Sequence, residues 1–309
     1  MTARFAVAAA VLLAGAALAA APAAGAATRE VWIAATPVTW NMAPNGRDHI
    51  TGTPLDPAQT VLNTTVYRRY TRHWRRPLVN TPVSGNHNLI PGPLIRARVG
   101  DRIVVHFRNM DFTRMNGHSM HFHGVEYKPS SDGAHVPGVS GRDGNVPPGG
   151  SWTYRLKAGR GSVGAWPYHD HSTSMHESIA GGMYGMLSIR GRHEPLPDRE
   201  FVVVFAPMGD FQTIGGRAFV GNTPVFRARV GDLVQWNVMA MGSEHHTFHV
   251  HGHRWREAGG VFRDTHTVGP AESFRFRWRE RDPGTWLYHC HVEQHMERGM
   301  IGTYRVRRR

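Results

Sequence analysis

The sequence predicts an all-β protein in which one sandwich domain occurs twice. Residues 96–101 read RARVGD and recur letter for letter at residues 227–232, and each copy precedes a short apolar run. A His-x-His cluster, an alternating aromatic and basic stretch and a second His-x-His cluster then follow in the same order in both halves. Short Val-, Ile-, Phe- and Trp-rich runs between Gly, Pro and Asp turns, with little helical periodicity, favour β-sandwiches.

Length and composition are consistent with this prediction. The chain has 309 residues, which favours about two domains, and 40% of them are hydrophobic. Its 35 glycines and 20 prolines stay below the roughly 25–30% typical of low-complexity chains, so disordered and collagen-like classes are excluded. The formal charge is +13, and all but two of the 36 basic residues are arginines. Such a charge could suit nucleic acid, an anionic surface or acidic substrates.

Residues 1–27 predict a signal peptide. A short basic start is followed by an apolar Ala/Leu/Val run over 5–21 and by small residues over 22–27, which is the pattern of secretory signals. A membrane anchor is the alternative, because about 20 apolar residues could span a bilayer. The Ala-rich run is broken by Pro22, which favours cleavage. No twin arginine precedes it, so we expect general secretory export to a periplasmic or extracellular location.

The repeat predicts a first domain over 28–190, a linker over 191–199 and a second domain over 200–309. Residues 274–279 alternate aromatic side chains with arginines. Because successive side chains of a strand point to opposite faces, we expect the aromatics in the core and the arginines in water. This explains much of the positive charge and argues against nucleic acid as a partner.

The histidines predict metal binding. Residues i and i+2 of a strand point to the same face, so each His-x-His pair can offer two imidazoles to one metal. A single pair is more often two polar side chains exposed on a surface, but four pairs in two repeats favour metal binding. The eight imidazoles are those of His121, His123, His169, His171, His249, His251, His289 and His291.

Cys290 is the single cysteine, so it cannot form an internal disulfide, and in an exported protein it requires another role. It lies between His289 and His291 and therefore faces the opposite side of its strand, which lets one strand contact two metal sites. A thiolate with two imidazoles and a weak thioether is the ligand pattern of blue copper. The residues that complete this set are His246, His295 and Met300. The eight imidazoles on the other side are more ligands than one metal ion can bind, and their number suits three coppers.

These segments resemble the four copper-binding segments of multicopper oxidases. The two-repeat length and the secretion signal resemble the bacterial two-domain, or small, laccases. The resemblance covers roughly residues 85–309, and its fourth segment, His-Cys-His-x3-His-x4-Met from His289 to Met300, is highly specific. It implies two cupredoxin-like Greek-key β-sandwich domains and four coppers per chain: one of type 1, one of type 2 and two of type 3.

The resemblance also implies a role for each ligand. The type 1 copper would be held by His246, Cys290, His295 and Met300. The type 2 copper would be held by His121 and His249. The type 3 pair would be held by His123, His169, His171, His251, His289 and His291. In this family, electrons enter at the type 1 copper through the position of His295, pass through Cys290, and reduce dioxygen to water at the other three coppers.

The first repeat departs from the second at Asp170, which stands in the place of Cys290, so it cannot hold a blue copper. His176 and Met183 look like remnants of such a site, but ordinary loop roles are favoured. The departure argues against copper nitrite reductases, whose blue copper lies in the first domain.

Less specific candidates follow the first His-x-His pair. Glu126, Tyr127 and Asp132 resemble positions near the copper cluster of small laccases. Asp132 could deliver protons and Tyr127 an electron to an oxygen intermediate, with loop roles equally open. The methionines that flank the type 1 segments could favour cuprous ions, although packing is favoured; these are Met239, Met241 and Met296.

The sequence therefore predicts a secreted, laccase-type oxidase that couples oxidation of phenolic or similar donors to reduction of dioxygen. The alternatives are a Cu(I) or other metal oxidase in copper tolerance, a copper nitrite reductase, and a copper-binding envelope protein that is not an enzyme. The expected partners are dioxygen and a small-molecule reductant, without nucleic acid. The resemblance implies a homotrimer with trinuclear sites between neighbouring subunits.

Overall fold

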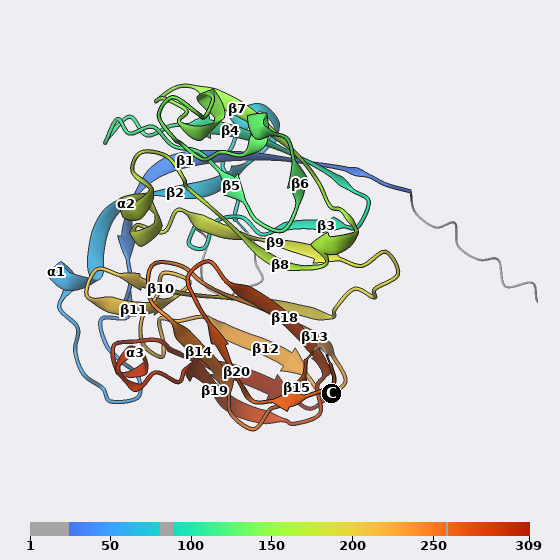
Figure 1. Cartoon of the computed structure of the whole chain (residues 1–309). Helices are drawn as coiled ribbons and strands as arrows, with labels where there is room; N and C mark the ends of the chain where they lie inside the picture. The colour runs from blue at the N-terminus through green and yellow to red at the C-terminus, as the bar shows by residue number, and fades with distance from the viewer. Residues whose placement is uncertain (1–24, 81–88, 258) are drawn as a thin grey trace, which may run out of the picture.

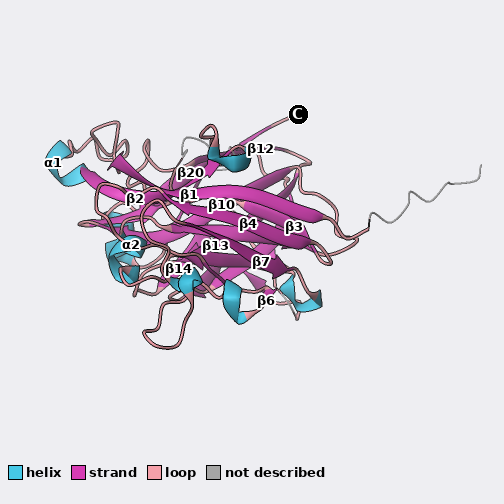
Figure 2. Cartoon of the chain, turned by 90° about the horizontal axis from the view of Figure 1, so that it is seen from above, coloured by secondary structure: helices cyan, strands magenta, loops and turns pink. Residues whose placement is uncertain are grey.

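The computed structural model describes residues 25–80, 89–257 and 259–309 (Figure 1). Apart from residues 25–27, the predicted signal peptide lies outside the described residues. Within the described ranges, no helix combines the length and the apolar character needed to cross a membrane. Strands dominate, and the helices are short turns at the edges of the sheets (Figure 2). The predicted all-β fold is confirmed.

The first repeat consists of two sheets. One has the order β2-β1-β4-β7-β6, and the other has the order β3-β9-β8-β5. The strands of the first sheet are β1 (Thr28–Asn41), β2 (Val61–Tyr70), β4 (Arg102–Asn109), β6 (Glu126–Tyr127) and β7 (Ser151–Lys157). Those of the second sheet are β3 (Ile95–Arg98), β5 (His121–Phe122), β8 (Gly164–His169) and β9 (Tyr184–Arg190).

The second repeat also has two main sheets, with the orders β11-β10-β13-β18 and β12-β20-β19-β14-β17. The first contains β10 (Arg199–Met208), β11 (Phe211–Ile214), β13 (Leu233–Ala240) and β18 (Ser273–Arg279). The second contains β12 (Val225–Arg229), β14 (His246–Val250), β17 (Thr265–Val268), β19 (Gly284–Cys290) and β20 (Ile301–Arg307). A small hairpin pairs β15 (Trp255–Arg256) with β16 (Phe262–Arg263).

Helices connect the strands at the edges. The α-helices are α1 (Pro57–Thr60), α2 (Met175–Ala180) and α3 (Glu293–Glu297). The 3-10 turns are η1 (Arg72–Trp74), η3 (Pro129–Ser131), η4 (Arg142–Gly144) and η5 (Arg160–Ser162). Helix α2 precedes β9 in the first repeat and α3 precedes β20 in the second, so these helices hold equivalent places.

The two repeats share their topology as well as their sequence. In both, the first strand pairs in parallel with the strand after the RARVGD segment: β1 with β4, and β10 with β13. Gly100 and Gly231 have φ of +100° and +94°, a backbone conformation that favours glycine. The next residue, Asp101 or Asp232, accepts a hydrogen bond from the backbone N–H three positions earlier. A turn with these requirements explains why the six letters recur.

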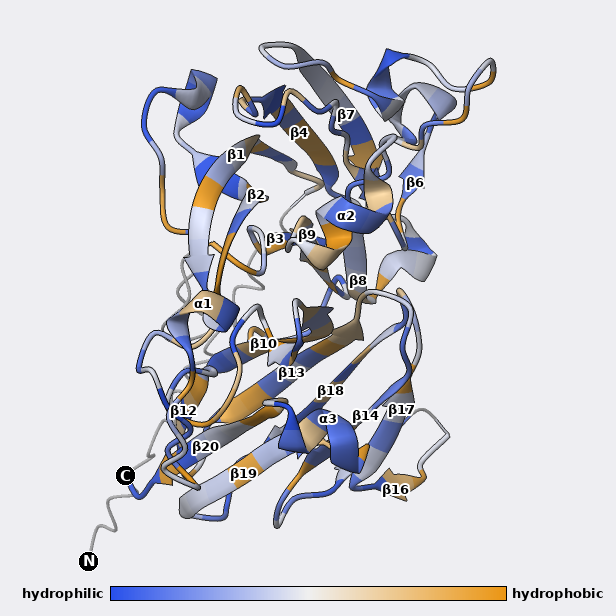
Figure 3. Cartoon of the chain, turned by 90° about the vertical axis from the view of Figure 1, so that its left-hand side faces the viewer, coloured by the Kyte–Doolittle hydropathy of each residue, from blue (hydrophilic) through white to orange (hydrophobic). Residues whose placement is uncertain are grey.

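Three hydrophobic cores hold the molecule together. One fills the first sandwich and includes Tyr154 and Tyr168. A second fills the second sandwich around Trp236. The third lies between the repeats, where β8 contacts β13 and β18 (Figure 3). It is rich in methionine. Met239 and Met241 belong to this third core, so packing accounts for both side chains.

The prediction for residues 274–279, which lie in β18, is partly wrong. Phe274, Phe276 and Trp278 do contact the second core, but Arg275 and Arg277 do not face water. Each guanidinium lies 2.9 Å from the Glu194 carboxylate, and only 12% and 15% of the two side chains is exposed. The outer face of this sheet packs against the first repeat, which a period-2 pattern cannot distinguish from a face in water.

Candidate metal centres

The cysteine-containing cluster lies at one end of the second sandwich. Cys290 ends β19, His246 begins β14, and His295 lies on α3. The Cys290 Sγ atom is 3.8 Å from His246 Nδ1 and 3.6 Å from His295 Nδ1, and the two nitrogens are 3.1 Å apart. Metal bonds of roughly 2.0–2.3 Å to nitrogen and sulfur fit within a triangle of this size.

The surroundings of this cluster suit a soft metal ion. Cys290, His246 and Met300 are fully buried, and Cys290 N–H donates to the carbonyl of Met300 at 3.1 Å, so the backbones of the two residues are adjacent. Burial raises the pKa of the Cys290 thiol, although a hydrogen bond from the Thr247 N–H opposes this. A bound metal would deprotonate the thiol. Burial, followed by the nearby His295, lowers the pKa of His246 to about 3, so this imidazole is neutral and free to coordinate.

The remaining predicted ligands form two groups of four imidazoles. In the first repeat, His123 Nε2 and His169 Nε2 are 3.2 Å apart. In the second repeat, His251 Nε2 and His289 Nε2 are 3.0 Å apart. The pairing of β5 with β8 sets His121 opposite His169, and that of β14 with β19 sets His249 opposite His289. His171 and His291 complete the groups through ring contacts with His121 and His249.

Backbone carbonyls orient four of these rings. Each Nδ1 donates a hydrogen bond, which fixes the tautomer and leaves Nε2 as the ligand atom. The pairs are His121 with Asp132 at 2.7 Å, His169 with Asp170 at 2.9 Å, His249 with Asp264 at 2.7 Å, and His289 with Cys290 at 2.8 Å. The Cys290 residue therefore places its thiol in one cluster and holds a ligand of the other through its carbonyl.

Burial keeps three of the eight imidazoles unprotonated. It is the largest cause that lowers the pKa of His123, His169 and His289 to about 4, and neighbouring imidazoles lower it further. Neutral nitrogens packed within hydrogen-bond distance of one another, with their outer nitrogens already donating, are a donor set that copper prefers. The two groups nevertheless remain separate in one chain: each set of ligand atoms found within 4.8 Å comes from a single repeat.

In the first repeat, a triad of ionisable residues occupies the place of the cysteine cluster. Buried Asp170 accepts from His118 Nδ1 at 2.9 Å, and His118 Nε2 lies 3.1 Å from Asp111 Oδ2. Burial opposes the charge on His118, but the hydrogen bonds to the two carboxylates raise its pKa overall. Sequence reasoning missed His118, although it precedes His121 by three positions, as His246 precedes His249. His176, the suggested remnant, is exposed.

Two of the three less specific candidates adjoin the first histidine group. Asp132 Oδ1 lies 3.5 Å from His121 Nδ1, and the Tyr127 and His121 ring centres are 6.2 Å apart. Burial and a hydrogen bond to Asp132 raise the pKa of Tyr127. Glu126 instead forms an exposed ion pair with Lys157 at 2.9 Å.

Sequence reasoning also missed Glu244, which contacts the outward nitrogen of a predicted type 1 ligand. Its Oε2 atom lies 3.2 Å from His295 Nε2 and accepts from Gln212 Nε2 at 2.7 Å. The Glu244 side chain is 44% exposed, so a carboxylate reaches solvent directly beside the cysteine cluster. No spacing in the sequence signals this contact, because Gln212 and His295 come from distant segments.

Copper retention should persist well below the pH at which exposed histidines lose metals. Because burial lowers the pKa of His123, His169 and His289 to about 4 and that of His246 to about 3, protons compete with copper at these nitrogens only near those values. Dialysis of the loaded protein in steps from about pH 7 to about pH 3, with copper counted per chain, should show most copper retained at about pH 5. Circular dichroism at each step monitors unfolding. Loss of half the copper near pH 6 with the fold intact would contradict the assignment of these four histidines as copper ligands.

Two models of multicopper oxidase domains match the chain, over residues 67–194 and 196–309. The human protein "Ferroxidase HEPHL1" is 28% identical over 347 residues, which cover 91% of this chain and 29% of that protein. A "Probable nitrite reductase-hydroxylamine oxidoreductase fusion protein" from Kuenenia stuttgartiensis is 29% identical over 248 residues, which cover 72% of this chain and 28% of that protein. The chain thus spans less than a third of these relatives.

Solved structures share the fold. A multicopper oxidase structure matches with a TM-score of 0.69 and 23% identity, covering 90% of this chain and 89% of the other. The copper nitrite reductase from Nitrosomonas europaea matches with a TM-score of 0.68 and 18% identity, covering 90% and 94%. The predicted cupredoxin-like architecture is confirmed by this likeness, and membership of the family implies an oxidoreductase that binds copper. The two domain matches show that the chain belongs to the multicopper oxidase family.

Proposed function

We propose that this protein is a laccase-type oxidase that takes single electrons from phenolic or similar donors and uses them to reduce dioxygen to water. The observation that carries the proposal is the double contact of Cys290, whose thiol faces His246 and His295 while its carbonyl holds His289. Copper bound at these ligands would supply one-electron oxidation at the cysteine cluster and reduction of dioxygen at the histidine groups.

The chain's own residues separate the two sites. Cys290 and Met300 are fully buried, whereas His295 is only partly buried and lies on the side that Glu244 shares with solvent. A donor can therefore approach His295 without reaching the histidine groups. The proposed copper content is four per chain: type 1 at the cysteine cluster, type 2 at His121 and His249, and the type 3 pair at the six remaining imidazoles.

The separation of the two histidine groups supports a homotrimer. Each repeat supplies four imidazoles, and within one chain they do not converge. A head-to-tail interface that closes with threefold symmetry would bring the first repeat of one subunit to the second repeat of the next and complete three equal sites. Asp132 and Tyr127, which adjoin His121, would then serve such a site as proton and electron donors. We further propose export of the chain by its N-terminal signal.

Oxidation of a metal ion is the second candidate. The Glu244 carboxylate beside His295 is the kind of ligand that would hold a cation next to the predicted point of electron entry, and two relatives, one human and one from mouse, are named "Ferroxidase HEPHL1". The nitrite reductase alternative is weaker, because Asp170 takes the cysteine position in the first repeat. Oxygen uptake distinguishes either oxidase from a copper-binding protein that is not an enzyme.

Replacing the thiol tests the proposed function. Cys290→Ser should remove the visible absorption of the copper thiolate, lower the copper content to about three per chain and reduce oxygen uptake with a phenolic donor to background, because the hydroxyl is a poor ligand for copper. The measurements are copper analysis, absorption and an oxygen electrode. His245→Gln, an exposed neighbour of His246, is the control and should change none of them. Turnover that survives Cys290→Ser would disprove the proposed path.

The shared-site proposal predicts complementation between inactive variants. His121→Ala/His123→Ala and His249→Ala/His251→Ala should each be inactive, because each destroys one half of every site. Co-expression of equal amounts should restore about a quarter of the wild-type oxygen uptake, because random mixing leaves one junction in four with both halves intact. Absence of recovery in verified mixed oligomers would show that one chain builds its own site.

Glu244→Gln distinguishes the two donor classes. If a metal cation is the donor, loss of the carboxylate charge should lower kcat/KM for ferrous or cuprous ions by about tenfold or more and leave that for a neutral phenol within about twofold. If a phenol is the physiological donor, metal oxidation should be slow in the wild type and little changed in the variant. Steady-state oxygen uptake with each donor provides the comparison.

A further inference from the structure

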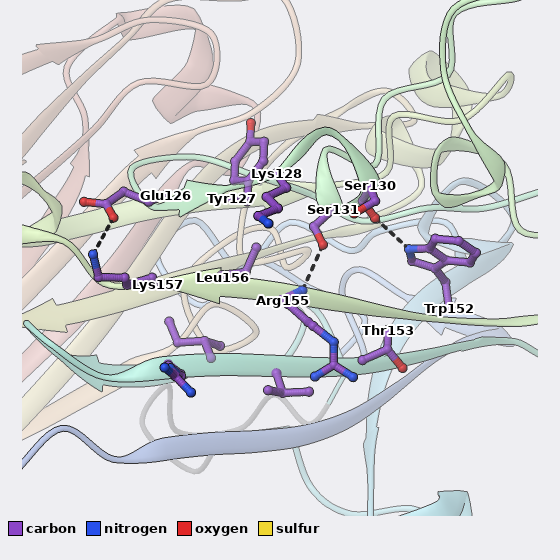
Figure 4. Close-up of a pocket in the computed structure, with 13 residues that line it drawn as sticks. Glu126, Tyr127, Lys128, Ser130, Ser131, Trp152, Thr153, Arg155, Leu156 and Lys157 are labelled. Atoms are coloured by element: carbon purple, nitrogen blue, oxygen red, sulfur yellow. Dashed lines mark hydrogen bonds and ion pairs between the residues drawn. The ribbon is translucent and has the colours of Figure 1, made fainter.

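We propose that the outer face of the first sheet carries a binding site for a small aromatic anion. The site is a groove of about 890 Å³ between β4, β7, β6 and η3 (Figure 4), and none of its lining residues is a predicted metal ligand. Its volume lies within the range of roughly 300–1,000 Å³ that is usual for small-molecule sites. The proposal does not depend on the redox function, because the groove is formed by residues that are not metal ligands.

Four cationic side chains line the groove, and three of them have no carboxylate partner among the described residues. Lys128 and Lys157, the two lysines of the entire chain, both line it, together with Arg102 and Arg155. Lys157 is paired with Glu126. No carboxylate of the described residues lies within ion-pair distance of the other three cations. A groove with three uncompensated cations favours an anion.

The floor of the groove is apolar and held in place. Val104 of β4 and the partly buried Trp152 of β7, which also packs against the first core, supply the apolar lining, whereas the neighbouring Leu156 is buried in that core. Trp152 Nε1 donates to the Ser130 carbonyl at 3.0 Å, and the Ser131 hydroxyl accepts from the Arg155 N–H at 3.0 Å. Figure 4 shows both contacts tying η3 to β7. An apolar floor with a charged rim suits a flat hydrophobic body that carries one anionic group.

The same features disfavour a polyanion. A polymer bound by charge alone needs an extended row of cations along its backbone, whereas this site is concave and has an aromatic side chain at its floor. Tyr127 lines this groove and also the hollow beside His121 and His123. A ligand in the groove would therefore share a wall with the first histidine group.

Calorimetry with naphthalene-2-sulfonate tests the proposal on the full chain as purified. We expect one site per chain and binding of the neutral isostere naphthalene-2-sulfonamide at least about tenfold weaker, since it lacks the charge. The double variant Lys128→Gln/Arg155→Gln should weaken sulfonate binding by about tenfold or more. The matched control is Arg227→Gln/Arg305→Gln, which removes two exposed cations from a cross-strand pair in the second repeat and should bind as the wild type does.

Acetylation gives a readout that needs no variant. Because the chain has two lysines, mass spectrometry can follow each one, with the N-terminal amine as internal standard. Bound naphthalene-2-sulfonate should slow acetylation of Lys128 severalfold and leave that of the N-terminus unchanged. Three results would overturn the proposal: equal binding of the sulfonamide, an equal loss in the control variant, or binding at Lys128 and Arg155 of a heparin oligosaccharide but not of the sulfonate.

Discussion

Alternation along β19 is the constraint on which both metal-ligand clusters depend. Successive side chains of a strand point to opposite faces, so Cys290 turns toward the interior of the second sandwich while His289 and His291 turn away from it. The register with β14 then sets His249 opposite His289 and brings His246 to the thiol. A shift of one residue in this pairing would exchange the faces and separate both donor sets. Two chemically distinct sites are thereby joined by one peptide segment.

The two repeats share one fold but place different side chains at equivalent positions. In the second, two neutral imidazoles and one thiol converge and leave room for a metal. In the first, Asp170 replaces the cysteine, and His118 lies between its carboxylate and that of Asp111. A buried charge is tolerated only when it is paired and hydrogen-bonded, and this triad meets that condition. The first repeat can then present its histidine group rigidly from β5 and β8 without a metal behind it.

Contacts between the repeats decide which polar side chains meet water. The exposed fractions of Arg275 and Arg277 are small, and both guanidinium groups bind Glu194 in the segment between β9 and β10. Close by, the Glu200 carboxylate accepts hydrogen bonds from Ser188, Gln235 and Asn237. The outer face of the sheet that contains β13 and β18 is therefore an internal surface, and its positive charge is unavailable to a partner. The uncompensated cations of the first sheet, in contrast, surround an open groove.

The sequence by itself determined the fold class and the duplication, because these depend on local spacing: strand alternation and the RARVGD turn. The His-x-His pairs predicted which residues would serve as ligands. The sequence did not reveal His118 or Glu244, nor the environment of the strand arginines. Those depend on which segments meet after folding, and a period-2 pattern carries no record of what covers the outer face of a sheet. Only the tertiary structure decided that the eight imidazoles form two groups of four in one chain, because the distance between repeats is set by the packing of β8 on β13 and β18 rather than by any motif.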